Sequence, residues 1–515
     1  MDKTNTPVIG KDVIESLTLG MYEDSKFIYR EYIQNAADQI DKAIKDRLLN
    51  QNEGEIHINI DPDGRLIVIE DNATGIPNSQ VLSILQNIAQ STKQRGIDKG
   101  FRGIGRLGGL GYCEKLIFET SFKGEVVKSI MTWDATKLKQ IINNRNNKEE
   151  AADVISEITA YETIKEIEDL HYFKVTLLGI TNDDLLNVKE IRRYLSMIAP
   201  VPFSNKFIFK SEIYNELKKE NLTIDEYKIF INTEQLFKGY STYIYRGDEN
   251  RKEKVGEVIG LEFFKDYDEK GNLLFFGWYS LTTSMNEQMK AINRARGFRL
   301  RKSNIQVGNE YTLEKLHREQ RGNFYFFGEV YAAHSDLLPN SRRDYFVEND
   351  CYIEFEKRLK THFYKLKDLY YVASNASSAT KRIEEYELAQ KNFIDKTESK
   401  GFIDKTDQTS EIEKLEKKKE QALAAQKDLE RLVIKHKDDK AFNRVISKVT
   451  ENKNTFVETF ELTELNNKPK FRTDNLSTLN KEQRKFLAKI FSVIRDVLDE
   501  NTAEELIRKI EEEVK

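Results

Sequence analysis

Residues 27–43 read FIYREYIQNAADQIDKA, and this stretch decides the fold of the first part of the chain. Ile33, Ala36 and Ile40 recur at three- and four-residue steps and form one apolar stripe. The pattern predicts an amphipathic core helix within residues 22–49.

A polar row lies on the opposite face of this predicted helix. Glu31, Asn35 and Asp38 stand at i, i+4 and i+7, which places them one above another. Taken alone, this row also fits an ordinary solvated helix face. Its meaning therefore depends on the motifs that follow along the chain.

A β-hairpin with an unusual exit follows the helix. Residues 56–60 alternate isoleucine with other side chains, residues 61–64 (DPDG) form a turn, and residues 66–69 (LIVI) predict a second strand. Directly after it, residues 70–76 read EDNATGI, so that a carboxylate at a strand end meets a glycine-containing turn. An acidic surface turn is the ordinary interpretation of such a segment by itself.

A glycine-rich segment comes next. Seven of the 25 glycines fall between Gly96 and Gly111, and residues 100–105 read GFRGIG. Glycines allow backbone N–H groups to approach phosphates closely. The P-loop pattern is absent, and the segment does not open a helix after a parallel strand, which sets aside P-loop and Rossmann sites.

Further strands are predicted at residues 115–121, 126–133 and 172–178, with a charged helical insertion at about residues 147–168. Helices on one face of an antiparallel sheet make an α+β layer domain.

Together, the three motifs resemble the N, G1 and G2 boxes of the GHKL ATPase superfamily, over roughly residues 12–180. Residues 27–43 and 84–91 (ILQNIAQS) are most similar to the heat-shock chaperone (HtpG-like) branch, with the MORC ATPases as near relatives. The resemblance implies the Bergerat fold, with ATP and Mg²⁺ as ligands.

The resemblance also implies residue roles. Glu31 would be the general base for the attacking water, Asn35 the Mg²⁺ ligand, and Asp38 a support for the water shell of the metal. Asp71 would accept a hydrogen bond from the adenine amino group, while Gly75 would let the base lie flat against the chain. The whole implied cofactor-binding set is Asn35, Asp38, Asp71, Gly75, Ile76, Lys93, Gly100, Arg102, Gly103, Ile104, Gly105 and Thr176.

This sequence departs from the family pattern at two positions. Ala73 replaces a glycine of the G1 box, and Gln90 stands where heat-shock chaperones usually have a lysine. Lys93 and Lys99 lie close by in the lid, so the sequence does not decide which cation meets the triphosphate.

Residues 337–344 read LLPNSRRD and resemble the heat-shock middle-domain loop whose arginine reaches the γ-phosphate. Arg342 or Arg343 would be that catalytic residue, although a surface arginine pair fits equally well. Separately, six cations fall within residues 290–302, as Lys290, Arg294, Arg296, Arg299, Arg301 and Lys302. A solvated basic face is one interpretation, and a nucleic-acid site through residues 290–302 is the other.

Three domains are expected in a chain of 515 residues. They are a GHKL ATP-binding domain at residues 1–200, an α+β middle domain at 201–375, and a charged helical, coiled-coil and dimerisation region at 376–515. Residues 482–514 are amphipathic and favour self-association into a homodimer.

Composition limits the remaining classes of function. The net charge of -4 excludes a globally basic nucleic-acid binder, and two cysteines exclude a disulfide scaffold or cysteine-rich zinc site. No signal or membrane segment is recognisable, so a cytoplasmic protein without membrane contact is expected. The predicted function is an ATP-hydrolysing, chaperone-like clamp acting on a protein client or partner subunit; the alternative is a nucleic-acid-associated or antiviral-defence ATPase of MORC or MutL type.

Overall fold

The computed structural model describes residues 9–18, 24–88, 105–144, 149–458, 471–472, 476 and 478–514, and its fold is α+β. The chain forms two compact units. The first comprises Met1–Ser284 and Gln288–Lys367, and the second comprises Met285–Glu287 and Asp368–Lys515.

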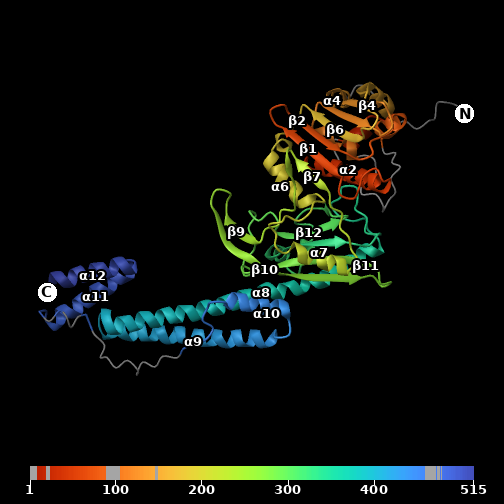
Figure 1. The fold of residues 1–515 in the computed structure, drawn as a ribbon. Helices are drawn as coiled ribbons and strands as arrows, with labels where there is room; N and C mark the ends of the chain where they lie inside the picture. The colour runs from red at the N-terminus through yellow and green to blue at the C-terminus, as the bar shows by residue number, and fades with distance from the viewer. Residues whose placement is uncertain are drawn as a thin grey trace. The chain divides into compact units, whose positions relative to one another are not determined.

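An eight-stranded sheet is the centre of the first domain (Figure 1). Its strands are β1 (Glu55–Asp61), β2 (Leu66–Asp71), β3 (Lys115–Ser121), β4 (Val127–Asp134), β5 (Thr159–Lys165), β6 (Tyr172–Leu178), β7 (Lys228–Ile231) and β8 (Glu234–Gln235). The spatial order is β5-β4-β3-β6-β2-β1-β7-β8, and all neighbours pair antiparallel except β1 and β7. The hairpin predicted from residues 56–69 is confirmed as β1 and β2.

Helices pack on this sheet through one shared core. The predicted helix is α2 (Phe27–Lys45), and its Ile33 and Ile40 lie in the same hydrophobic cluster as Ile67 and Leu177 of the sheet. Each of these four side chains is at most 1 % exposed. The remaining helices of the domain are α1 (Asp12–Thr18), α3 (Val81–Leu85), α4 (Ala135–Asn143), α5 (Ala151–Ile158) and α6 (Val188–Ile198).

The insertion predicted as helical at residues 147–168 is only partly so. Helix α5 ends at Ile158, and β5 begins at the next residue and pairs with β4 along its whole length. β5 is an edge strand with a mostly exposed side-chain pattern, which is why its charged residues resembled a helix surface.

The second domain contains a six-stranded sheet. Its strands are β9 (Tyr243–Gly247), β10 (Lys252–Tyr267), β11 (Leu273–Thr282), β12 (Gly297–Lys302), β13 (Ile305–Val307) and β14 (Phe327–Ala332), in the order β13-β12-β14-β11-β10-β9. Helix α7 (Lys210–Lys219) packs on it through a cluster in which Phe203, Tyr240, Trp278 and Phe327 meet ring to ring.

Buried charges fix this second sheet to the segment that enters it. Lys238 donates to Glu329 Oε2 over 2.7 Å, and Arg301 forms an ion pair with the same carboxylate. Arg301 Nη2 also donates to Met197 O at the end of α6, at 2.7 Å. Burial lowers the pKa of Lys238 to about 7, whereas burial would raise the pKa of Glu329 but Arg301 and Lys238 hold it at about 2. Because each charge has partners, the two domains are joined by a satisfied polar network.

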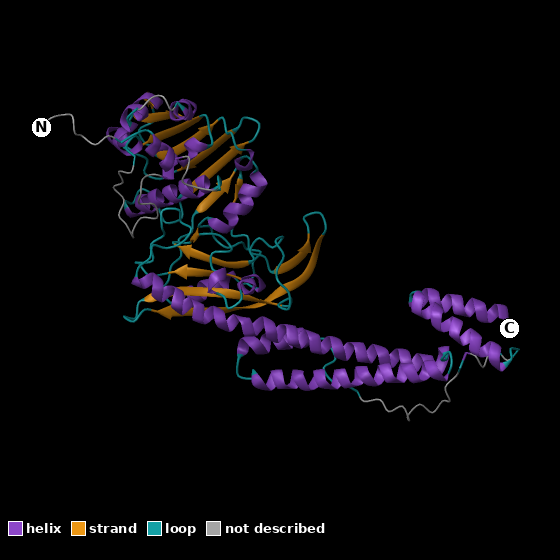
Figure 2. Cartoon of the chain, turned by 180° about the vertical axis from the view of Figure 1, so that it is seen from behind, coloured by secondary structure: helices purple, strands orange, loops and turns teal. Residues whose placement is uncertain are grey.

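The second compact unit is helical (Figure 2). Its helices are α8 (Asp350–Asp395, from residue 368 onward), α9 (Lys405–Lys435), α10 (Lys440–Thr450), α11 (Lys481–Val497) and α12 (Glu500–Val514). α8 and α9 lie side by side in both views, and Ile383, Ala422 and Leu429 belong to one cluster between them. The helix predicted within residues 411–437 is thus confirmed as part of a helical pair.

The amphipathic segment at residues 482–514 forms two helices. Leu498 is extended between α11 and α12, and the Asp499 side chain accepts from Thr502 N at 3.2 Å. Phe491 and Ile507 are buried between the helices, whereas Phe486, Val493 and Val497 are 66 %, 59 % and 74 % exposed.

Within the described ranges, every helix is too short or too polar to cross a membrane.

Candidate active site

The polar row predicted on α2 is present and partly enclosed. Glu31, Asn35 and Asp38 occupy one side of α2; the Glu31 side chain is 13 % exposed and Asp38 is buried. Two buried tyrosines hold the helix in place. Tyr29 donates to Leu185 O at 2.6 Å, and Tyr32 donates to Arg106 O at 2.9 Å. These bonds fix the direction in which the polar row points.

Glu31 lies against Gly105, within the glycine-rich segment. A Cβ atom added to Gly105 would lie 2.3 Å from Glu31 Oε2, so no larger residue fits without moving the carboxylate. The two residues are 74 positions apart in sequence. The structure therefore brings together one residue from the predicted N box and one from the predicted G2 box.

The acidic turn after β2 is tightly built. Asp71 is 4 % exposed, and its Oδ1 accepts from Ala73 N at 3.1 Å. Gly75 has φ of 64°, and a Cβ there would lie 1.9 Å from Ser121 O. Only glycine satisfies both constraints. Ala73 is fully buried, which shows that the turn accommodates this departure from the family pattern.

Sequence reasoning missed two residues that hold this turn. The amide of Ile76 donates to Thr120 Oγ1 at 2.8 Å, and Thr120 donates to Tyr172 O at 3.0 Å. His171 Nδ1 donates to Ala73 O at 2.7 Å. Thr120 and His171 belong to no motif; Thr120 lies on β3, which pairs with β6, and His171 directly precedes β6.

Thr176 is not brought to the side of the sheet that carries Asp71. The register pairs Thr176 with Val68, and Phe173 with Asp71. Directly paired residues share a face and successive residues alternate, so Thr176 and Asp71 lie on opposite faces. On the Asp71 face, the threonine nearest to Phe173 is its other partner, Thr120.

Several predicted lid residues lie outside the described residues. They are Lys93, Gly100, Arg102, Gly103 and Ile104. Gln90 and Lys99 also lie outside the described residues.

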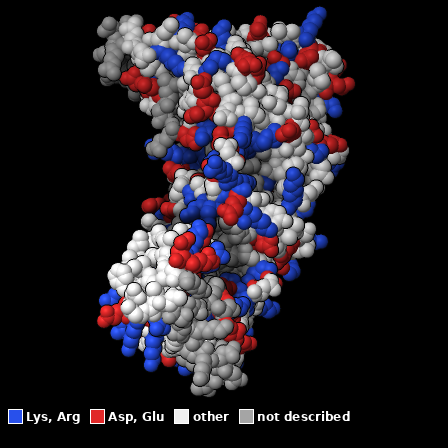
Figure 3. Space-filling model, turned by 90° about the vertical axis from the view of Figure 1, so that its left-hand side faces the viewer, with Lys and Arg blue, Asp and Glu red and all other residues white. Residues whose placement is uncertain are grey.

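The basic run at residues 290–302 is not a continuous surface. Arg301 is fully buried with Glu329, Arg299 is 4 % exposed and contacts Glu310, and Lys302 donates to His334 O. These three cations bind partners within the protein. Both predictions for residues 290–302, a solvated basic face and a polyanion site formed by all six cations, are therefore wrong. Over the face shown in Figure 3, acidic side chains are mixed with the basic ones.

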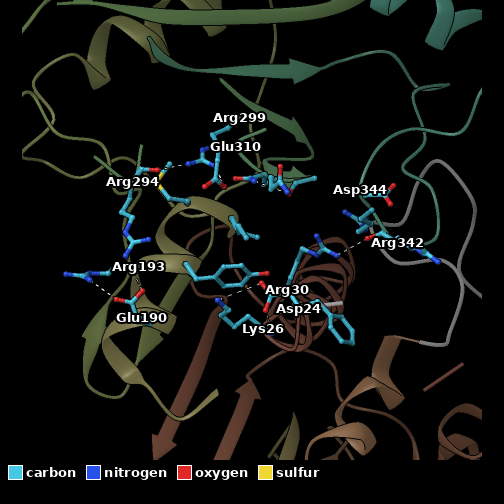
Figure 4. A pocket seen from close by; sticks show the side chains of 18 residues that line it. Asp24, Lys26, Arg30, Glu190, Arg193, Arg294, Arg299, Glu310, Arg342 and Asp344 are labelled. Carbon is cyan, nitrogen blue, oxygen red and sulfur yellow. Dashed lines mark hydrogen bonds and ion pairs between the residues drawn. The ribbon is translucent and has the colours of Figure 1, made fainter. Parts of the chain in front are cut away.

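The predicted arginine loop reaches α2. Arg30 Nη2 donates to Arg342 O at 3.2 Å (Figure 4). Arg30 Nε lies 3.8 Å from Glu31 Oε1. Arg342 is exposed, whereas Arg343 is 8 % exposed and has φ of 53°. The loop at residues 342–344 therefore lies against the part of α2 that carries Glu31.

The residues present fit a nucleotide with Mg²⁺. Asp71 offers a buried carboxylate acceptor beside the turn at Gly75, which has no side chain. The polar row on α2 (Glu31, Asn35 and Asp38) offers the oxygen ligands that Mg²⁺ prefers. Mg²⁺ keeps several waters and needs few protein ligands. The described part of the chain has no cluster of three or more His, Cys, Asp or Glu side chains that could hold a metal.

Comparison with known proteins agrees with this geometry. Residues 26–165 match the family described as "Histidine kinase-, DNA gyrase B-, and HSP90-like ATPase". The chaperone protein HtpG of Wigglesworthia glossinidia brevipalpis is 28% identical over 294 residues, covering 52% of this chain and 41% of that protein. HtpG of Escherichia coli (strain K12) is 24% identical over 239 residues, covering 43% and 38%.

HtpG of Salinispora tropica is 29% identical over 87 residues, covering 16% of this chain and 14% of that protein. The chain thus spans at most about two fifths of the length of these three relatives. Domains of the matched type bind ATP, typically with Mg²⁺. The chain therefore carries a GHKL-type ATPase domain and has the HtpG chaperones as distant homologues.

Proposed function

We propose that this protein hydrolyses ATP in its N-terminal domain and uses the nucleotide cycle to close a dimeric clamp of heat-shock chaperone type. The observation that carries the proposal is the contact of Arg30 with both the Arg342 loop and the Glu31 carboxylate. Through it, the second domain reaches the helix that bears the proposed base. In the proposal, a movement of the Arg342 loop therefore changes the position of Glu31, and a movement of Glu31 changes that of the loop.

In this proposal Glu31 orients and deprotonates the water that attacks the γ-phosphate. A general base within one hydrogen bond of that water contributes about 10² to 10⁴ in rate. Asn35 supplies an oxygen ligand to Mg²⁺, and Asp38 supports the water around it. When bound, Mg²⁺ neutralises charge on the phosphates. Because Gly105 has no side chain, the Glu31 carboxylate can lie against this part of the predicted lid.

We expect Asp71→Asn to weaken ATP binding by about 1 to 3 kcal/mol, because the amide presents an N–H where the site needs an acceptor. Titration calorimetry with ATP and the full chain measures this loss. Asp61→Asn on β1, whose residue is exposed, is the matched control and keeps wild-type affinity. Wild-type affinity in Asp71→Asn means that adenine binds elsewhere.

A clamp also needs a dimer contact, and α11 carries a suitable surface. Phe486, Val493 and Val497 are exposed along this helix, although each is large and apolar. Exposed apolar side chains that recur on one helix face mark an interaction surface. In the proposal, a second copy of the chain covers them.

Removing residues 482–515 should lower oligomeric mass and ATP turnover together, while nucleotide binding in the N-terminal domain survives. Phe486→Asp combined with Val493→Asp should have the same effect without shortening the chain, since both side chains are already exposed. Mass photometry and steady-state ATPase assays provide the readouts. A monomeric variant as active as the unaltered protein rejects the clamp.

The alternative is a nucleic-acid-associated or antiviral-defence ATPase of MORC or MutL type. Burial of Arg299 and Arg301 weakens the support that residues 290–302 give to a nucleic-acid site. Binding to DNA that weakens steeply with salt would restore it.

A further inference from the structure

A cavity of about 470 Å³ lies where the ATPase domain meets the second domain (Figure 4). The start of α2 and one side of α6 form one wall, and residues 306–310 and 342–344 form part of the other. Its volume is that of a small-molecule site.

The cavity wall carries an excess of positive charge. Its lining includes six arginines and one lysine but four carboxylates. Arg193 and Arg294 share Glu190, at 2.6 Å and 3.5 Å, and Arg299 contacts Glu310 at 3.2 Å. The lining therefore carries three more cations than carboxylates, and two of the cations, Arg30 and Arg193, also lie beside Glu31 and Glu249 outside it. A cluster of positively charged side chains in a partly enclosed cavity attracts an anion.

Buried polar atoms in the wall also lack hydrogen bonds. Arg30 Nε and Arg299 Nε are buried donors without a hydrogen-bond acceptor in the described chain, and these residues are 7 % and 4 % exposed. Such donors carry a desolvation cost that an added acceptor would offset. Guanidinium groups match the geometry of phosphate oxygens, which they bind with paired hydrogen bonds.

This cavity shares Arg342 and Arg343 with the proposed hydrolysis, but its other lining residues differ from those of the proposed nucleotide site. Its lining includes Phe27 and Arg30 of α2 but not Glu31, Asn35 or Asp38. Asp71 does not line it either. The two sites therefore use neighbouring faces of the same helix.

We infer that this cavity is a second anion site, which binds a small phosphate-bearing anion between the two domains. The anion accepts hydrogen bonds from arginines of both domains and so strengthens their contact. This goes beyond the proposed hydrolysis, and binding at the cavity requires no turnover. The phosphate group can come from a free anion or from the phosphate chain of a nucleotide, and the test separates these sources.

The test is titration calorimetry of the full chain with pyrophosphate, with and without saturating ADP. Arg193→Gln and Arg294→Gln should each weaken pyrophosphate binding about tenfold, since each removes a charged donor. Both side chains are partly exposed, at 29% and 57%, so the fold should tolerate the changes. Lys189→Gln is the matched control, because Lys189 is also on α6 and contacts Glu249 as Arg193 does, but lies outside the cavity lining.

Pyrophosphate binding that persists with ADP and falls in both arginine variants, but not in Lys189→Gln, supports the second site. If ADP displaces pyrophosphate and itself binds more weakly in both arginine variants, the phosphate chain of a nucleotide occupies the cavity. The inference is overturned by no binding to the unaltered chain, by equal binding in all variants, or by displacement with ADP whose affinity is the same in all variants. Absence of ATPase activity in the unaltered chain would refute the proposed function and leave this binding result unchanged.

Discussion

Glu31→Ala should lower ATP turnover by about 10² or more and leave ATP affinity within a few-fold, because a general base acts chiefly in the transition state. The carboxylate is 13 % exposed, lies 3.8 Å from Arg30 and touches Gly105. Its removal therefore takes a charged group from the centre of the site. Steady-state phosphate release and calorimetric ATP binding measure the two effects separately.

Glu31→Gln is the size-matched control for this experiment. It keeps the packing against Gly105 but cannot accept the proton, so its turnover should fall as far as that of Glu31→Ala. Unaltered turnover in either variant removes Glu31 from the mechanism. Lost affinity in both would instead make it a binding residue.

The second large effect is expected in the arginine loop. Replacing the arginine that stabilises transferred charge, Arg342 or Arg343, by alanine should lower turnover by about 10³ with little change in ATP binding. This corresponds to about 4 kcal/mol. Arg342 is exposed and its backbone contacts Arg30, whereas Arg343 is buried, so the single variants distinguish the two.

Arg321→Ala provides the control, since that arginine is 52% exposed and pairs locally with Glu319 in the same domain. It should retain full activity. Mass photometry should show unaltered oligomers in all three variants. Full activity in both Arg342→Ala and Arg343→Ala contradicts the middle-domain assignment.

Local periodicity predicted the elements that carry most of the candidate site. The apolar stripe of α2 gave the helix, and with it the common side of Glu31, Asn35 and Asp38. Alternation predicted β1 and β2, so that Asp71 falls at a strand end beside a glycine turn. These features depend on neighbours within a few residues of each other.

Features that depend on distant pairing could not be predicted in this way. Thr176 was assigned by motif, but strand register decides its face, and one residue of offset reverses it. The sequence places Arg301 in a run of apparent surface cations, because its buried partner Glu329 is 28 positions away. The role of Thr120 arises from contacts with two other segments, at Ile76 and Tyr172.

The most direct test of the nucleotide site is photolabelling of the unaltered chain with 8-azido-ATP, followed by peptide mapping. The reagent reacts beside the bound adenine. We predict label on peptides that contain Asp71–Ile76 or strand β6, and loss of that label with excess ATP. Label confined to residues beyond 200, or label that excess ATP does not displace, would contradict an ATP site at Asp71.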